Sequence, residues 1–198
     1  MPDYKAPLRD MRFVLNEVLD LDAHYQHLGL EEINSELLNA FLEEGAKFAE
    51  NELAPLNRSG DEEGCGFDNG EVTTPKGFKE AYAKYVEGGW PAMGGDPEFG
   101  GQGLPGSAGI AISEMTGTAN WSWSMYPGLS HGAVATIEEH GTDEQKQAYL
   151  PKLTSGEWTG TMCLTEPHCG SDLGILKSKA EPNADGSYNI TGTKIFIS

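Results

Sequence analysis

Residues 162–172 read MCLTEPHCGSD, and they carry the most information in this sequence of 198 residues. Residues 161–164 predict a short apolar strand, and Pro167 then breaks the chain into a turn that ends Gly-Ser-Asp. Such a turn offers a hydroxyl at each end, on Thr165 and Ser171, with free backbone amides between them. Consecutive free amides bind anions. The turn therefore suits a ligand that has both a polar ring edge and a phosphate.

The period of the hydrophobic residues changes after residue 157. From there on the apolar residues alternate as in β-strands. Asp185-Gly186 is a strong hairpin signal that predicts pairing of about residues 176–181 with 187–191. Residues 194–198, KIFIS, predict a further apolar strand with one aromatic. Earlier in the chain the apolar residues recur at helical spacing, so we expect β structure only after residue 157.

The first part of the chain is predicted to be helical. The clearest helix covers residues 30–53, where one apolar stripe recurs at helical spacing until Pro55 ends it. Thr142 and Gln145 form a capping box, so another helix begins there and ends at Pro151. We expect further helices over residues 77–86, 110–115 and 132–140, and solvated loops over residues 59–72 and 94–106.

Composition excludes two broad classes of protein. Thirteen basic against thirty-one acidic residues give a net charge of −18, and the sequence has no basic stripe that would bind nucleic acid. No apolar run approaches the roughly 18 residues that span a bilayer. The first residues lack the basic-then-apolar order of a signal peptide. Three cysteines, an odd number, argue against a secreted disulfide scaffold and favour a cytoplasmic location.

Several motifs occur in the order found in one enzyme family. Leu164–Asp172 matches a Leu-Thr-Glu-Pro-x-x-Gly-Ser-Asp signature, and residues 196–198 match an aromatic-Ile-Thr/Ser strand that follows it by about a hairpin. Residues 99–103 and 141–150 fit as well. With these motifs the sequence resembles the acyl-CoA dehydrogenase family of flavoenzymes along essentially its whole length. Residues 4–13 resemble a branch with an N-terminal extension, which includes 3-methylmercaptopropionyl-CoA dehydrogenase-like proteins.

The resemblance implies a mainly α fold, in which an N-terminal helical domain precedes the first strands of a small β-barrel domain. It divides the chain into an extension (1–30), a helical domain (31–157) and the incomplete start of the β domain (158–198). Within the extension, residues 10–19 have the spacing of a short amphipathic helix. We expect this helix to pack on the helical domain or on a partner subunit.

The resemblance also implies an activity. The chain is expected to be the N-terminal portion of an FAD-dependent acyl-CoA dehydrogenase of fatty acid metabolism, which removes an α-proton and a β-hydride from an acyl-CoA thioester. The expected partners are the acyl-CoA, an electron acceptor such as electron-transfer flavoprotein, and further copies of the chain in a dimer or tetramer. The family's base is a Glu of a later domain, so no catalytic residue is assigned and the chain alone is expected to be inactive.

By resemblance, the residues that contact the flavin lie in the two β segments. Thr165 meets the ring edge and Phe196 lies against the ring, while Gly170 and Ser171 approach the pyrophosphate. The expected cofactor-binding residues are Met162, Leu164, Thr165, Gly170, Ser171, Phe196, Ile197 and Ser198. The expected substrate-binding residues are Ser171, Tyr126, Gly128 and Leu129, of which the last three lie in a predicted break between helices.

Other polar residues of the motif are interpreted as structural. Glu166 and Asp172 are expected to orient the loop by bonds to backbone amides. No metal site is assigned, because a zinc site needs a second pair of ligands beside Cys163, His168 and Cys169.

Residues 101–106 match the pattern G-x-G-x-x-G, which occurs in dinucleotide-binding turns. That function requires a strand before the pattern and a helix that opens within it. Neither is predicted here, since a glycine-rich segment precedes it and a proline interrupts it. We therefore interpret these residues as a loop on the substrate side.

Two other functions remain open. The chain could be a naturally short, non-catalytic helical binding module that kept the fold, and its intact mass from the native source would reveal this. It could also belong to an acyl-CoA oxidase-like flavoenzyme, which passes electrons to oxygen. Oxygen consumption separates that function from a dehydrogenase.

Overall fold

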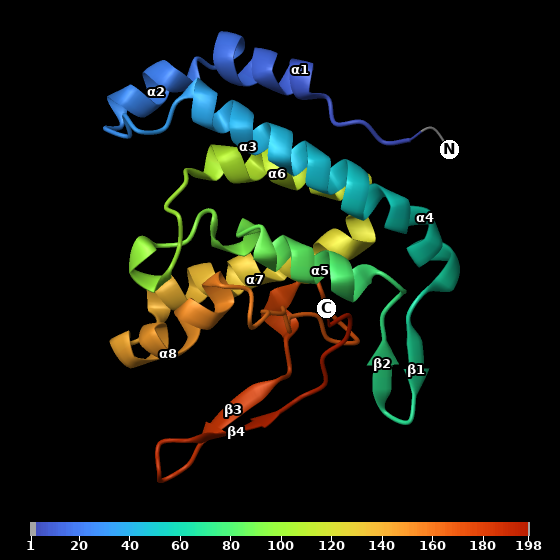
Figure 1. Cartoon of the computed structure of the whole chain (residues 1–198). Helices are drawn as coiled ribbons and strands as arrows, with labels where there is room; N and C mark the ends of the chain where they lie inside the picture. Colours follow the sequence, from blue (N-terminus) through green and yellow to red (C-terminus); the bar gives the residue numbers. More distant parts are fainter. Residues whose placement is uncertain (1–2, 198) are drawn as a thin grey trace.

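The protein is mainly helical, with two short hairpins that project from the helices (Figure 1). The structure is a computed structural model that describes residues 3–197. Its α-helices are α1 (Leu8–Arg12), α2 (Leu21–His27), α3 (Ser35–Phe48), α4 (Ala54–Glu63), α5 (Phe78–Glu87), α6 (Gly106–Ala119), α7 (Trp121–His140) and α8 (Asp143–Thr154). Its strands are β1 (Gly66–Asp68), β2 (Glu71–Thr73), β3 (Lys179–Pro182) and β4 (Tyr188–Thr191). This order confirms the predicted helical domain followed by the first strands of a β domain.

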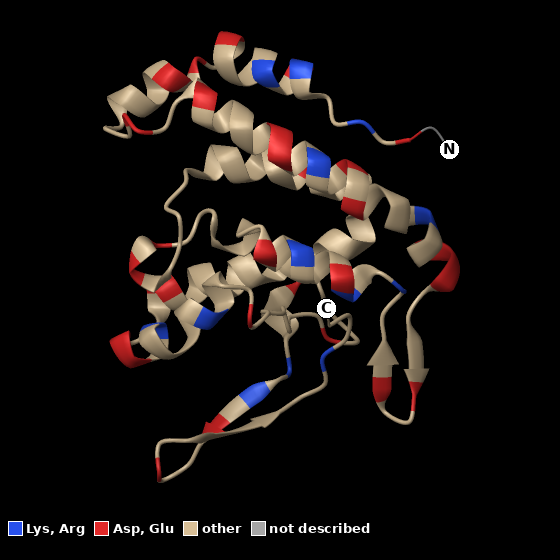
Figure 2. Ribbon diagram, in the orientation of Figure 1, with Lys and Arg blue, Asp and Glu red and all other residues tan. Residues whose placement is uncertain are grey.

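Acidic residues are spread over the helices and both hairpins, with Lys and Arg scattered among them (Figure 2). The distribution agrees with the net charge of −18, and within residues 3–197 the Lys and Arg positions form no continuous run along the ribbon. None of the helices in the same range is long and apolar enough to cross a membrane.

One long helical rod runs from α3 through a π-helical turn, Ala49–Leu53, into α4. The rod begins at Ser35, where the Asn34 side chain accepts a hydrogen bond from the Leu37 amide at 3.0 Å. The prediction that Pro55 ends this helix is wrong. Proline lacks one amide donor, and here it lies in the first turn of α4, directly after the π-helical turn, where a missing donor costs little.

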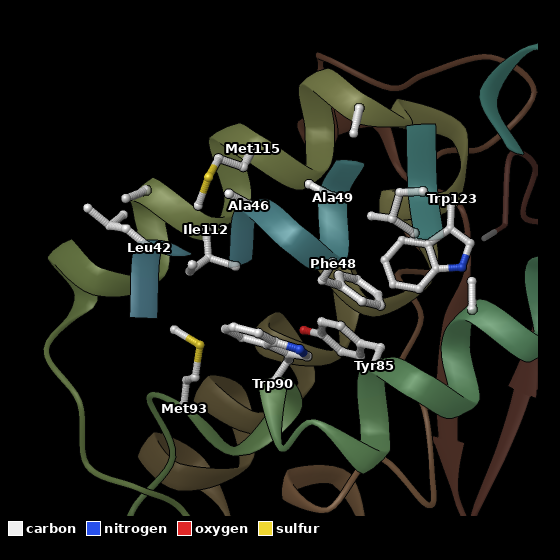
Figure 3. Packing of buried hydrophobic residues seen from close by; sticks show 14 of the residues in the cluster. Leu42, Ala46, Phe48, Ala49, Tyr85, Trp90, Met93, Ile112, Met115 and Trp123 are labelled. Atoms are coloured by element: carbon white, nitrogen blue, oxygen red, sulfur yellow. The ribbon is translucent and has the colours of Figure 1, made fainter. Parts of the chain in front are cut away.

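The main core lies where α3, α5, α6 and α7 meet. Gly45 lets α3 and α6 approach closely, since an added Cβ there would lie 2.4 Å from Ile112 Cδ1. Figure 3 shows aromatic rings gathered at this point, contributed by Phe48, Tyr85, Trp90 and Trp123. The indole nitrogen of Trp123 donates to the carbonyl of Phe78 at 3.2 Å, so the deepest ring of the core has its one polar atom satisfied.

Asn120 links two parts of this core. Its side chain is fully buried between α6 and α7. The side-chain oxygen accepts a hydrogen bond from the Trp123 amide at 3.0 Å and so caps α7. The side-chain nitrogen donates to the carbonyl of Leu53, on the long rod, at 3.3 Å.

The N-terminal extension lies along α3 (Figure 1). Lys5 Nζ lies 2.6 Å from Glu50 Oε2, and Met11 is buried in the main core. Residues 10–18 are helical, and Met11 and Leu15 pack on the helical domain, as predicted. A π-helical turn, Phe13–Val18, follows α1, and its wider spacing turns two of the predicted apolar positions to solvent.

A hairpin replaces much of the loop predicted over residues 59–72. α4 continues to Glu63, and β1 then pairs antiparallel with β2, with Phe67 opposite Val72. Asn69-Gly70 forms the connecting turn, with φ of 49° and 87°. Positive φ at both positions is the conformation that Asn-Gly favours in two-residue hairpins. The prediction that β structure occurs only after residue 157 is therefore wrong.

Two helices continue through prolines. The predicted break at residues 125–129 is wrong, because α7 runs through Pro127, which is buried in the helix interior. The predicted capping box is confirmed, since Gln145 Oε1 accepts from the Thr142 amide at 2.9 Å and the Gln145 amide donates back at 3.3 Å. α8 nevertheless passes Pro151 and ends at its last buried turn. An interior proline costs about 3 kcal/mol, and packing of the buried face offsets this cost.

The described chain after α8 has little regular structure. The hairpin β3–β4 confirms the prediction from Asp185-Gly186, although its strands are shorter than predicted. Residues 161–164 and 194–197, which we predicted as strands, are irregular. A strand requires a ladder of backbone bonds with a neighbour. The two segments are joined at the bond from the Ile195 amide to the Thr165 carbonyl, 2.9 Å long, and no ladder extends from it within the described residues.

Replacing Asn120 by Ala is expected to lower the free energy of unfolding by about 2 kcal/mol, because the change removes a helix cap and strands a buried carbonyl. Asn34→Ala removes only an exposed cap and should cost about 1 kcal/mol. Urea denaturation of the intact protein measures both. Equal effects of the two substitutions would contradict the linking role of Asn120.

Candidate functional site

The signature motif folds into a tight turn. The Glu166 amide donates to the carbonyl of Cys169 at 2.9 Å, and the Cys169 amide donates to the carbonyl of Glu166 at 3.1 Å. These reciprocal bonds close a two-residue turn at Pro167-His168. The turn brings Gly170 back beside Thr165, because an added Cβ on Gly170 would lie 3.3 Å from Thr165 Cγ2.

The Glu166 carboxylate lies at the centre of this turn. Its residue is only 3% exposed. The two oxygens accept hydrogen bonds from the Lys177 amide at 2.8 Å, the Ser178 amide at 2.9 Å and Lys194 Nζ at 3.0 Å. Donors on Ser178, the Lys177 amide and the Lys194 ammonium hold the pKa of Glu166 well below its usual range. A carboxylate so occupied is a poor base, and it orients the loop through backbone amides, as predicted.

Lys194 connects the C-terminal segment to the turn. Besides Glu166, its ammonium donates to the carbonyl of Leu164 at 3.1 Å. The next residue, Ile195, donates its amide to the Thr165 carbonyl. The two segments that carry the motifs therefore lie side by side, held by one ion pair and two hydrogen bonds to backbone carbonyls.

The predicted cofactor residues lie in this one region. Four of them flank the turn: Leu164, Thr165, Gly170 and Ser171. Three are apolar and exposed beside it: Met162, Phe196 and Ile197. Phe196 is 86% exposed, and its φ of 56° is left-handed. Ser198 lies outside the described residues.

Asp172 also behaves as predicted. Its side-chain oxygen accepts a hydrogen bond from the Gly174 amide at 3.2 Å and caps the 3-10 turn Leu173–Ile175. The carbonyl of Ile175 in turn lies 3.0 Å from His168 Nε2. Both carboxylates of the motif therefore fix loop geometry.

Glu166, His168 and Cys169 bring a carboxylate oxygen, an imidazole nitrogen and a thiol within 4.8 Å of one another. A metal ion at this point would have to displace the Lys194 ammonium and the two backbone amides that donate hydrogen bonds to Glu166. The donor set therefore suits a structural hydrogen-bond network better than a metal centre.

The predicted substrate residues on α7 are divided between two surroundings. Tyr126 lines a pocket of about 250 Å³ with Phe78, Tyr82 and Thr159. Gly128 and Leu129 belong to the next turn of α7, where Gly160 packs so tightly that an added Cβ would lie 3.3 Å from the Leu129 carbonyl. Thr159 and Gly160 are adjacent, so the two surroundings meet at the segment that follows α8.

A second cavity, of about 270 Å³, lies between α5, α6, α7 and the glycine-rich loop. Its aromatic and apolar lining comes from Tyr85, Trp90, Met93, Leu104 and Ile112. Two polar side chains, Ser113 and His131, also face it, and desolvation by the surrounding walls lowers the pKa of His131. The preceding residue on α7, Ser130, accepts a hydrogen bond from the Gly160 amide at 3.0 Å, so α7 links the cavity to the segment that leads into the motif.

Sequence reasoning did not identify Lys194 as the partner of Glu166, nor the lining of this cavity. A lysine before an apolar segment carries no local signal for a partner 28 residues earlier. The cavity had no such signal either, because Gly106 and Gly109 were not part of the helix predicted over residues 110–115.

Comparison with known proteins agrees with this geometry. Residues 35–157 match the family described as acyl-CoA dehydrogenase, N-terminal domain. The 3-methylmercaptopropionyl-CoA dehydrogenase of Ruegeria pomeroyi is 41% identical over 194 residues, which are 98% of this chain and 33% of that protein. The chain spans about a third of the length of the curated relatives it matches.

Two solved structures share the fold. The acyl-CoA dehydrogenase of Bacillus anthracis, complexed with FAD, matches with a TM-score of 0.69 at 28% identity, over 84% of this chain and 27% of that one. A structure described as the electron transferring flavoprotein of Acidaminococcus fermentans matches with a TM-score of 0.66 at 27% identity, over 81% and 39% of the two chains.

The stabilisation from Glu166 is expected to depend on pH. Its folded pKa is lowered, so the contribution is full above the ordinary value of 4.5 and is lost as pH falls through the folded pKa. Glu166→Gln should therefore lower the thermal midpoint at neutral pH, and this difference should shrink in strong acid. Glu181→Gln, which breaks an exposed pair with Lys179, serves as the control. A Glu166→Gln difference that is constant from neutral pH to pH 2 would contradict the assignment.

Proposed function

Because the chain belongs to the acyl-CoA dehydrogenase family, we propose that it forms the front part of an FAD-dependent enzyme that dehydrogenates an acyl-CoA thioester. The observation that carries the proposal is the turn around Glu166. It holds Thr165 beside a segment with two exposed apolar side chains, Phe196 and Ile197. A flavin needs this combination, because its ring has apolar faces and a polar edge. When bound, FAD accepts the hydride.

The ring is held by residues of the turn and of the C-terminal segment. Thr165 offers a hydroxyl and a backbone group to the ring edge, and Leu164 supports it from the preceding position. Met162, Phe196 and Ile197 supply apolar contact. Their exposure supports this role, since a large apolar side chain such as Phe196 favours burial against a ligand. Ser198 is proposed as a further hydrogen-bonding group for the flavin.

Backbone amides hold the phosphates. Lys194 is engaged within the turn, and Lys179 forms an exposed pair with Glu181 at 2.8 Å. Gly170 has no side chain that would obstruct a ligand, and Ser171 is exposed. With a net charge of −18, long-range attraction does not favour an anionic dinucleotide. Short-range donors at these two positions therefore bind the pyrophosphate, and Ser171 also approaches the substrate.

The acyl chain enters the cavity of about 270 Å³. Its aromatic and apolar lining supports this assignment, since an acyl chain favours contact with apolar side chains. Gly128 precedes His131 by three residues and so shares the cavity side of α7. Leu129 contacts the substrate from the part of α7 on which Gly160 packs. Tyr126, in its separate pocket, contacts a more distant part of the substrate.

The base that removes the α-proton lies outside the residues described above. Glu166 cannot serve, because three donors occupy its oxygens and its charge is needed to hold Lys194. The role of this chain is to bind, orient and exclude water. Proton removal requires a further carboxylate.

Electrons then leave to an electron-transfer flavoprotein. The intact protein acts in fatty acid metabolism as a homo-oligomer. Its three free cysteines, Cys65, Cys163 and Cys169, suit the reducing cytoplasm.

The function is tested with the intact protein loaded with FAD. Butanoyl-CoA, hexanoyl-CoA and octanoyl-CoA are each expected to bleach the flavin without oxygen and to reduce an electron-accepting dye. Retention of FAD with no bleaching by any thioester would indicate a binding module instead. Rapid oxygen consumption without the dye would indicate an oxidase.

Thr165→Val is expected to weaken FAD binding by about two- to tenfold, because it keeps the shape of the side chain and removes one hydrogen bond worth roughly 0.5–1.5 kcal/mol. Thr136→Val, on the exposed face of α7, makes the same chemical change away from the turn. Titration of FAD into the intact apoprotein measures both variants. Equal affinity in the two would remove Thr165 from the flavin site.

A further inference from the structure

The first turn of α6 forms a thin wall between two parts of the molecule. On one side, Ala108 is buried against residues of the N-terminal extension and α3, namely Leu21, Tyr25 and Leu38. On the other side, Gly106 and Gly109 line the cavity of about 270 Å³. Residues three apart share a side of a helix, so the two glycines face the cavity together. A displacement of this turn therefore changes the shape of the cavity.

This turn is weak as a helix by itself. α6 begins after Pro105 without a side-chain hydrogen bond that caps it, and two of its first four residues are glycine. Each glycine in a helix costs about 1 kcal/mol relative to alanine. The same glycines open the cavity, since an added Cβ on Gly106 or Gly109 would meet no atom within 4 Å. The two glycines thus enlarge the cavity and destabilise the first turn of α6.

Tyr25 on α2 supplies the missing support. It is 1% exposed, its ring packs against Ala108, and its hydroxyl is hydrogen-bonded to Ser107 Oγ. α2 is itself fixed at its start, where the Asp20 side chain accepts a hydrogen bond from the Ala23 amide. The support therefore comes from an element that precedes the helical domain in sequence.

We propose that Tyr25 is a positioning residue that sets the shape of the acyl cavity by holding the first turn of α6. The N-terminal extension thereby takes part in selecting the acyl chain, although it lines none of the cavity. The inference rests on the proposed function in one respect, namely that an acyl chain occupies the cavity.

The test uses the intact protein loaded with FAD and the variants Tyr25→Phe, Ser107→Ala and their double mutant. Arg12→Gln is the matched control, because it breaks the ion pair between Arg12, on the same extension, and Glu43 on α3. Hydrogen exchange of the amides of residues 107–113 reports on the wall. KM and kcat for butanoyl-CoA, hexanoyl-CoA and octanoyl-CoA report on the cavity.

Tyr25→Phe is expected to speed exchange in residues 107–113 by about fivefold, as for the loss of one hydrogen bond. KM for octanoyl-CoA should rise several-fold more than KM for butanoyl-CoA, with kcat unchanged, because the longer chain reaches the wall. The double mutant should be no worse than either single mutant, since all three lack the same bond. Arg12→Gln should change neither readout.

Unchanged exchange in a folded Tyr25→Phe protein would overturn the proposal, as would faster exchange with the same KM for all three thioesters. An equal effect of Arg12→Gln would reduce Tyr25 to a general stabilising residue and also overturn it. If Tyr25→Phe does not fold, Ser107→Ala removes the bond from the other side and decides by the same readouts. Should the native protein oxidise no thioester, the proposed function fails. Calorimetric binding of octanoyl-CoA then replaces KM.

Discussion

The carboxylate of Glu166 is the constraint on which the site depends. Burying a charged group is unfavourable unless hydrogen-bond donors surround it, and here three donors come from two other segments of the chain. The turn, the stretch at 177–178 and Lys194 are thereby joined at one point. Little regular sheet surrounds them, so the hydrogen bonds of one side chain replace a strand ladder as the element that fixes their arrangement.

The helices could be predicted from periodicity, because each buries a stripe of apolar residues. The residues at which they end could not be predicted in this way. A proline removes one local hydrogen bond. Leu53 and Trp123 are held by contacts from distant elements, and because of these contacts α4 and α7 remain helical at Pro55 and Pro127. The first hairpin had a clear local signal in Asn69-Gly70. That signal was outweighed by the acidic, glycine-rich composition around it.

The site was predictable where its geometry is local. The turn itself follows from the motif, because its backbone bonds between Glu166 and Cys169 close within three positions. Lys194 and the cavity lining could not be predicted, since both depend on how distant elements pack. Alternation of apolar residues predicted strands at 161–164 and 194–197. Alternation, however, indicates only which side chains of a strand would be buried. A ladder also needs neighbouring strands.

A cavity wall made of glycines has a consequence for how such a protein can diverge. A methyl group added at Gly106 or Gly109 would point into empty space, so it would shorten the cavity without a clash. It would also strengthen the helix, because alanine is the better helix former. A substitution that narrows selectivity at these positions would therefore also increase stability. The usual trade-off between the two does not arise there.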